Sequence, residues 1–170
     1  KDGYKEGQYA ENPYQSGWEN PVSLLARQNK TAVNRYLSSI SFDVSLLQNL
    51  VWKPMVSFDL NRSNNVQFVD PYSNIWGRNG DDNPTSDKGR GSNTVVNNAN
   101  LNIENTLNYS LKFDDSDVNF LGGMSMQKNT YTKDANSGTG FLVSQTSYDF
   151  NAAKNQSTEY RENNVRSMSY

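Results

Sequence analysis

The chain has 170 residues, with 16 basic and 18 acidic side chains and a formal net charge of -2. It contains no Cys and no His, which excludes disulfides, thiolate metal sites and Cys nucleophiles, and removes the commonest general base and metal ligand. Lys and Arg form no dense run, so nucleic acid is not an expected partner. No catalytic residue, metal or cofactor is expected, and the chain is not expected to be an enzyme.

Four segments alternate between apolar and polar residues with the period of a β-strand. The clearest runs from Ala99 to Phe113, where seven of the eight odd positions are apolar and none of the seven even positions is. No stretch reaches the about 20 apolar residues of a membrane-spanning helix. The sequence therefore predicts strands at 34–46, 51–62, 97–113 and 118–128, and the start of a fifth near 165–170.

The connections between these strands are unequal in length. Residues 47–50 and 114–117 are short turns, whereas 62–98 and 128–164 are long segments rich in Asn, Asp, Gly and Ser. Short turns at one end and long loops at the other are typical of outer-membrane β-barrels, and about ten tilted residues span their apolar band of about 25 Å. A soluble antiparallel β-sandwich also has alternating strands and remains the alternative.

The order and spacing of six segments resemble SusC/RagA-like TonB-dependent outer-membrane transporters. An NPVSLL segment precedes the first strand, and a periplasmic turn and two further hairpin strands follow in the family's order. The segments are 20–26, 34–44, 46–54, 108–113, 120–125 and 162–170.

This resemblance implies an all-β, antiparallel transmembrane β-barrel fragment with two hairpins and long extracellular loops. The chain is then an interior piece of the barrel in the outer membrane of a Gram-negative bacterium, without the plug domain. The implied function is import of oligosaccharides or peptides with a SusD/RagB-like surface lipoprotein. Its other partners are outer-membrane lipid, the remaining barrel strands and the TonB complex, which acts through the absent plug. The alternative is a soluble β-sandwich that binds surface glycans or acts as an adhesin.

The first long loop holds the candidate binding residues. Tyr72, Trp76 and Arg78 combine planar rings with a hydrogen-bonding side chain, as in recognition of sugars or peptides. They are predicted to contact substrate or the lipoprotein, with packing of the loop against the barrel rim as the alternative. Nearby, Asp81, Asp82 and Asp87 could supply oxygen ligands to Ca²⁺ or form a solvated acidic loop.

The strands themselves predict two faces. Asp43 and Asp59 fall at polar positions and are expected as lumen charges rather than as a catalytic pair. Tyr36 and Trp52 fall at apolar positions near strand ends and are expected as anchors at the membrane interface. The side chains predicted to face lipid are Ile40, Phe42, Val44, Val56, Phe58, Leu101, Ile103, Leu107, Leu111, Phe120 and Met124.

Overall fold

The structure is a computed structural model that describes residues 21–25, 27–69, 89–141 and 149–170. Among these residues, no helix is long and apolar enough to cross a membrane. In chain order the elements are the helix α1 (Pro21–Leu25), strands β1 (Gln28–Ser41), β2 (Val44–Leu47), β3 (Leu50–Val69), β4 (Arg90–Phe113) and β5 (Ser116–Thr139), the 3-10 helix η1 (Phe150–Ala152), and β6 (Asn155–Ser169).

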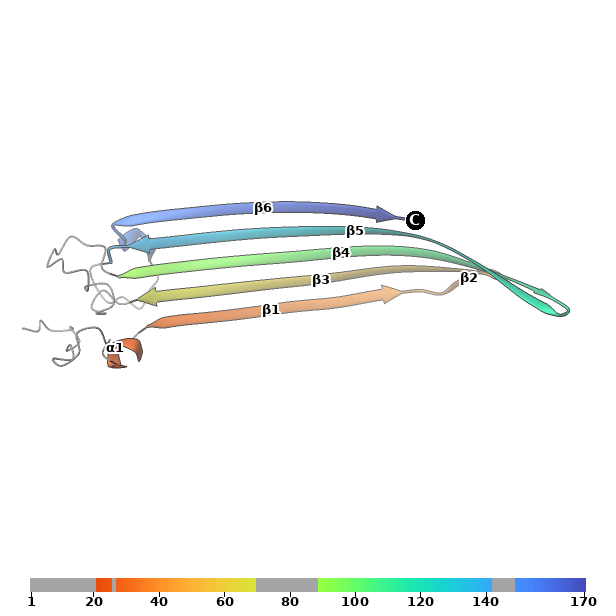
Figure 1. Ribbon diagram of the computed structural model, residues 1–170, viewed down its shortest axis with the longest axis horizontal. Helices are drawn as coiled ribbons and strands as arrows, with labels where there is room; N and C mark the ends of the chain where they lie inside the picture. Colours follow the sequence, from red (N-terminus) through yellow and green to blue (C-terminus); the bar gives the residue numbers. More distant parts are fainter. Residues whose placement is uncertain (1–20, 26, 70–88, 142–148) are drawn as a thin grey trace, which may run out of the picture. The chain divides into compact units, whose positions relative to one another are not determined.

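The described strands form a single antiparallel sheet of six strands. Its order is β1-β3-β4-β5-β6, and β2 pairs with β3 (Figure 1). The all-β antiparallel prediction is confirmed, and the last strand, β6, lies beside β5. Among the described strands, β1 and β6 each have one neighbour, so this sheet is not closed. The β-sandwich alternative needs a second sheet, and the described residues contain none.

Both short turns are confirmed. Two-residue turns at 48–49 and 114–115 join β2 to β3 and β4 to β5. The predicted strand at 34–46 is interrupted, however, because β1 ends at Ser41 and β2 begins at Val44. At the break, the Phe42 amide donates to the Pro54 carbonyl at 3.1 Å. Proline has no N–H for the sheet, but its carbonyl is used here.

The strands extend well into the segments predicted as loops. β3 continues to Val69, β4 begins at Arg90, β5 continues to Thr139 and β6 begins at Asn155. The prediction failed because parity reveals a strand only where one face is apolar, and both faces of these extensions are mostly polar. Asn is also uncommon in strands, so pairing with neighbouring strands outweighs local preference here.

The chain divides into two compact units. The first unit comprises residues 1–32, 63–95 and 133–160, and the second comprises 33–62, 96–132 and 161–170.

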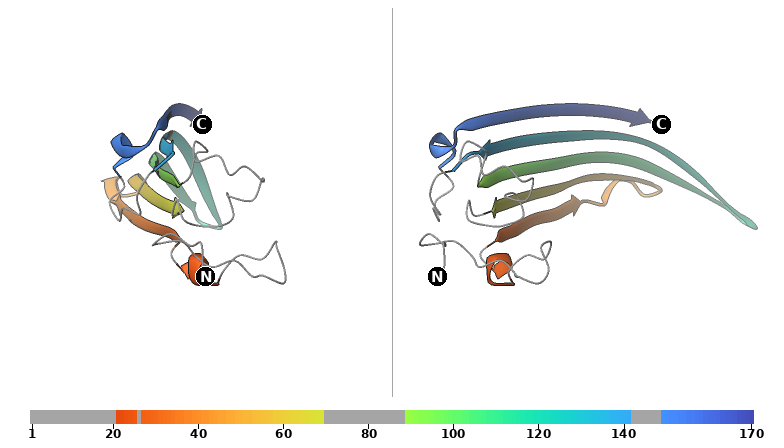
Figure 2. Two further views of the ribbon diagram at one scale, coloured as in Figure 1. Left: turned by 90° about the vertical axis from the view of Figure 1, so that its left-hand side faces the viewer. Right: turned by 60° about the vertical axis from the view of Figure 1, so that its left-hand side comes forward.

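The first unit contains the buried apolar core found among the described residues. Phe68, Phe141 and Ala153 are 4%, 3% and 8% exposed, and Phe150 packs against them. The Phe141 ring meets Phe68 edge-on at 5.5 Å and Phe150 edge-on at 6.4 Å between centroids. Phe150 belongs to η1, which leads into β6 (Figure 2). Gly138 makes this packing possible, because a Cβ there would lie 2.7 Å from the Ala153 Cβ.

Candidate functional site

Large apolar side chains of the second unit are exposed along strands β1 to β5. Nine of the eleven residues predicted to face lipid are exposed, among them Phe42 and Phe120 at 57% each. The other two, Ile103 and Leu111, are half-buried. Exposed side chains of this size point away from any core within the described residues. Their contact with lipid stays a prediction.

Polar contacts join residues at the alternate positions, which lie on the other face of each strand. Arg35 on β1 binds Asp59 on β3 with two hydrogen bonds, from Nε at 2.9 Å and from Nη2 at 2.7 Å. Lys53 contacts Asp43 at 2.8 Å. Each of the two predicted lumen carboxylates is therefore paired with a cation rather than with the other carboxylate.

Asparagine side chains form a second set of polar contacts in the second unit. Asn129 on β5 donates from Nδ2 to the Oδ1 atoms of Asn98, at 3.0 Å, and of Asn100 on β4. Further along β4, Asn102 donates to Glu104 at 2.6 Å. All five side chains are half-buried. We call Asn98, Asn100, Asn102 and Asn129 the amide ladder.

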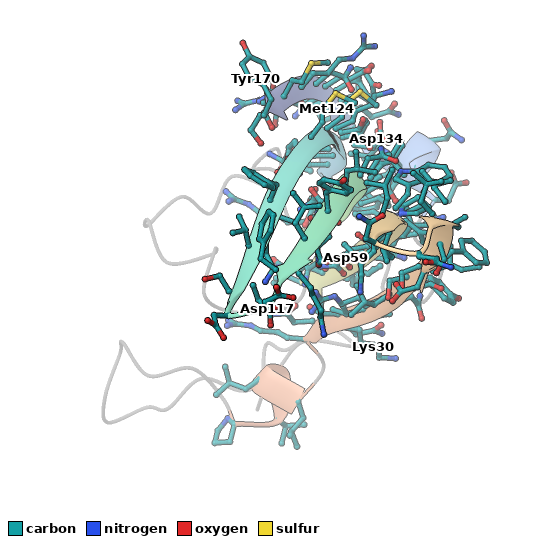
Figure 3. The ribbon with its side chains drawn as sticks, turned by 90° about the vertical axis from the view of Figure 1, so that its right-hand side faces the viewer. Lys30, Asp59, Asp117, Met124, Asp134 and Tyr170 are labelled. Carbon is teal, nitrogen blue, oxygen red and sulfur yellow. The ribbon has the colours of Figure 1, made fainter. Side chains whose placement is uncertain are left out.

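A shallow hollow of about 340 Å³ lies near the end of β6. Glu104, Ser125 and Ser169 line it, together with Met124 and Tyr170. The hydroxyls of Ser125 and Ser169 are 2.7 Å apart and hydrogen-bonded. Met124 lies on β5, and Tyr170 directly follows the neighbouring strand β6 (Figure 3).

An apolar groove of about 440 Å³ lies among Leu46, Trp52, Leu107 and Met124, beside the two adjacent glycines of β5. Of these two glycines, Gly123 is closely packed and Gly122 is not. A Cβ on Gly123 would lie 3.2 Å from the Thr106 methyl group, whereas a Cβ on Gly122 would meet nothing within 4 Å.

The predicted loop site lies outside the described residues. This holds for Tyr72, Trp76 and Arg78, and also for the acidic trio Asp81, Asp82 and Asp87. Within the described ranges, no three His, Cys, Asp or Glu side chains gather as a metal site would require.

The two residues predicted as interface anchors are both exposed, Tyr36 at 65% and Trp52 at 38%.

Sequence reasoning missed the amide ladder, although one signal for it was present: Asn98, Asn100 and Asn102 share one parity. The contribution of Asn129 depends on the register between β4 and β5, which parity does not give.

Comparison with known proteins gives structural matches only. No protein-family model matches the chain, and no curated protein sequence matches it. The fold is similar to chains of the RagAB peptide transporter, with a TM-score of 0.62, 16% identity and 87% of this chain covered. Structures of the RagAB peptide importer in the "closed-closed" and "open-open" states match with TM-scores of 0.56 and 0.55, at 16% and 14% identity over 85% and 87% of this chain. The chain spans 16% of the length of each of these structures.

Proposed function

We propose that the chain is a section of a β-barrel in the outer membrane and that the barrel imports peptides. One observation carries this proposal: a single sheet exposes most of its large apolar side chains at one parity of each strand and joins polar side chains at the other, with Val33, Leu37 and Leu121 as exposed apolar residues on the polar parity. A soluble protein rarely leaves so extensive an apolar surface uncovered. A membrane barrel needs this alternation, with apolar residues toward lipid and polar residues toward the lumen.

The edges of the sheet support further strands on both sides. β1 and β6 each pair with one described strand, and no described strand lies along the other edge of either. In hydrocarbon each unpaired group costs several kcal/mol, so sheets cross membranes only when closed. We therefore infer that β1 and β6 pair with additional strands that complete the barrel, of which the described sheet forms one section.

Peptide as the substrate is supported by the fold that the chain shares with the RagAB peptide transporter. Oligosaccharide remains the alternative substrate class. The proposal includes a SusD/RagB-like surface lipoprotein as partner, energy from the TonB complex, and no enzymatic activity of the chain itself. Tyr72, Trp76 and Arg78 are proposed to contact the peptide or the lipoprotein.

Uptake by living cells tests this function. Cells that produce the complete protein should accumulate a labelled peptide mixture, and cells with the gene deleted should lose most of this uptake. Collapse of the inner-membrane proton gradient should have the same effect as deletion, because transport would draw its energy from that membrane. A labelled oligosaccharide mixture serves as the comparison. Unchanged peptide uptake after deletion, or recovery of the protein in the water-soluble fraction, would contradict the proposal.

A further inference from the structure

The amide ladder leaves hydrogen-bonding groups of defined direction on the polar face. Asn129 uses both Nδ2 hydrogens on the oxygens of Asn98 and Asn100. Because these two oxygens accept from β5, the Nδ2 groups of the same amides point away from Asn129. Among the described residues, these Nδ2 groups donate to no acceptor. Two oriented donors therefore remain available.

Asn102 extends the ladder with an acceptor. Its Nδ2 donates to Glu104 at 2.6 Å, which fixes the amide and leaves Oδ1 on the opposite side of the group. Within the described residues, no donor reaches this oxygen. Along β4, Asn98 and Asn100 thus each offer a donor and Asn102 offers an acceptor, and these three residues are spaced two positions apart.

The spacing of these groups equals that of an extended peptide. A strand rises about 3.4 Å per residue, so side chains two residues apart on β4 are separated by about 6.8 Å along it. An extended peptide presents the N–H and C=O of every second residue on the same side, with this same repeat. A peptide lying along β4 could therefore pair with all three amides at once.

We infer that the amide ladder binds the main chain of an extended peptide. The Nδ2 groups of Asn98 and Asn100 donate to peptide carbonyls, and the Oδ1 of Asn102 accepts from a peptide N–H. The inference rests on the proposed function and sharpens it, because contacts to the main chain do not depend on peptide sequence. Side chains of the peptide that point away from β4 can then vary freely, as in other cases of main-chain recognition.

The composition around the ladder favours peptide over sugar. Sites for small organic ligands are ordinarily lined by apolar and aromatic side chains with a few polar groups. The even positions of β4 from 98 to 112 hold Asn, Asn, Asn, Glu, Thr, Asn, Ser and Lys, with no ring among them. These positions of β4 therefore offer repeated hydrogen bonds and no ring; the ring nearest to Asn129 at its own parity on β5 is Tyr131.

A matched pair of variants tests the ladder in the complete protein. Asn100→Asp keeps the oxygen that accepts from Asn129 and removes the Nδ2 donor. Asn108→Asp is the control, because it introduces the same charge on the same strand and parity, at a half-buried residue outside the ladder. Binding of several unrelated peptides of equal length is measured with the purified protein. Asn100→Asp should weaken binding of every peptide about 3- to 10-fold, and Asn108→Asp should change it less than 2-fold.

Ester-containing peptides give a second, independent readout. An ester in place of one peptide bond removes an N–H without changing any side chain. At the peptide position that pairs with Asn102, it should weaken binding about 3- to 10-fold to the unaltered protein and less than 2-fold to Asn102→Leu. The ladder variants Asn100→Asp and Asn102→Leu must both reach the outer membrane in normal amounts.

The outcomes separate this inference from the proposed function. If peptides bind but both ladder variants bind them like the unaltered protein, the ladder inference is wrong and peptide import stands. The inference is also wrong if the ladder variants affect only an oligosaccharide, or if affinity follows peptide side chains and ignores the esters. If the complete protein neither binds nor imports peptides, the proposed function and the inference both fail.

Discussion

Phenylalanine side chains have opposite surroundings in the two units. In the first unit, Phe68 and Phe141 are buried and pack edge-on, whereas Phe42, Phe58 and Phe120 of the second unit are exposed. Burial from water is the main stabilising term for a ring in an aqueous fold. Exposed rings repeated along several strands gain that stabilisation only from an apolar environment outside the chain. The contrast teaches that the first unit carries its own small core, while the second depends on its surroundings.

The largest effect is expected from removing the ring at the centre of the first unit's core. Phe141→Ala should lower stability by about 3 to 5 kcal/mol, because it leaves a cavity beside Phe68 and Phe150. Hydrogen exchange of the amides in residues 133–141 and 155–160 measures the loss. Phe58→Ala is the control, and it should leave exchange in these two segments unchanged. Equal protection in both variants would show that the first unit has no core of its own.

The next effect tests the environment of the second unit. Leu107→Arg places a charge on the apolar face and should cost about 2 to 4 kcal/mol near the bilayer midplane. Asn108→Arg places the same charge one residue further along, on the polar face, and should be tolerated. Urea titration of the complete protein folded into lipid vesicles compares the two. Similar losses for both variants would contradict the assignment of faces.

A smaller loss of stability should distinguish Gly138 from Gly122, two glycines of β5. Gly138→Ala brings a methyl group to 2.7 Å from the Ala153 Cβ, so the core must shift, at a cost of about 1 to 3 kcal/mol. Gly122→Ala meets nothing within 4 Å and should be neutral or slightly stabilising. The same urea titration measures both. A cost for Gly122→Ala as large as that for Gly138→Ala would mean that the groove beside Gly122 is filled.

The smallest effect is expected at the Arg35–Asp59 ion pair of the second unit. Asp59→Asn removes one charge of this pair, in which the Arg35 side chain is 60% exposed and the Asp59 side chain 25%. Exposed ion pairs contribute little, because water and salt screen them. The unfolding midpoint should therefore change little, and any change should shrink as salt is raised. A large destabilisation that persists in high salt would show that the pair is shielded from water.

The second unit was the predictable part of the molecule. Alternation at Leu101, Leu107 and Phe113 shows directly which side of β4 is apolar, and the acidic residues at 114–115 mark the turn that follows. The same parity also shows which face of β4 the side chains of Asn98 and Asn100 occupy. It does not show their hydrogen bonds to Asn129, because these depend on the register between β4 and β5, which backbone pairing fixes.

The first unit could not be predicted from the sequence in the same way. Its strand segments are polar at most positions, and between Ser63 and Val69 only Val66 and Phe68 continue the even apolar parity of β3. Its core brings Phe68 together with Phe141 and Phe150, which lie more than 70 residues further along the chain. Such contacts arise from the sheet order and from the space at Gly138, and neither leaves a local pattern. The break of β1 before Asp43 is also absent from the alternation.

The most direct test of the account is the environment of successive side chains on β3. The chain contains no Cys, so single Cys substitutions at residues 56–61 of a complete protein without other Cys residues give one labelling site each. Spin labels at these positions report collisions with membrane-dissolved oxygen and with a water-soluble nickel complex. With lipid on one side of β3 and the lumen on the other, labels at positions 56, 58 and 60 should be exposed to oxygen and labels at positions 57, 59 and 61 to nickel, in strict alternation. Equal access of the nickel complex to all six positions would contradict it.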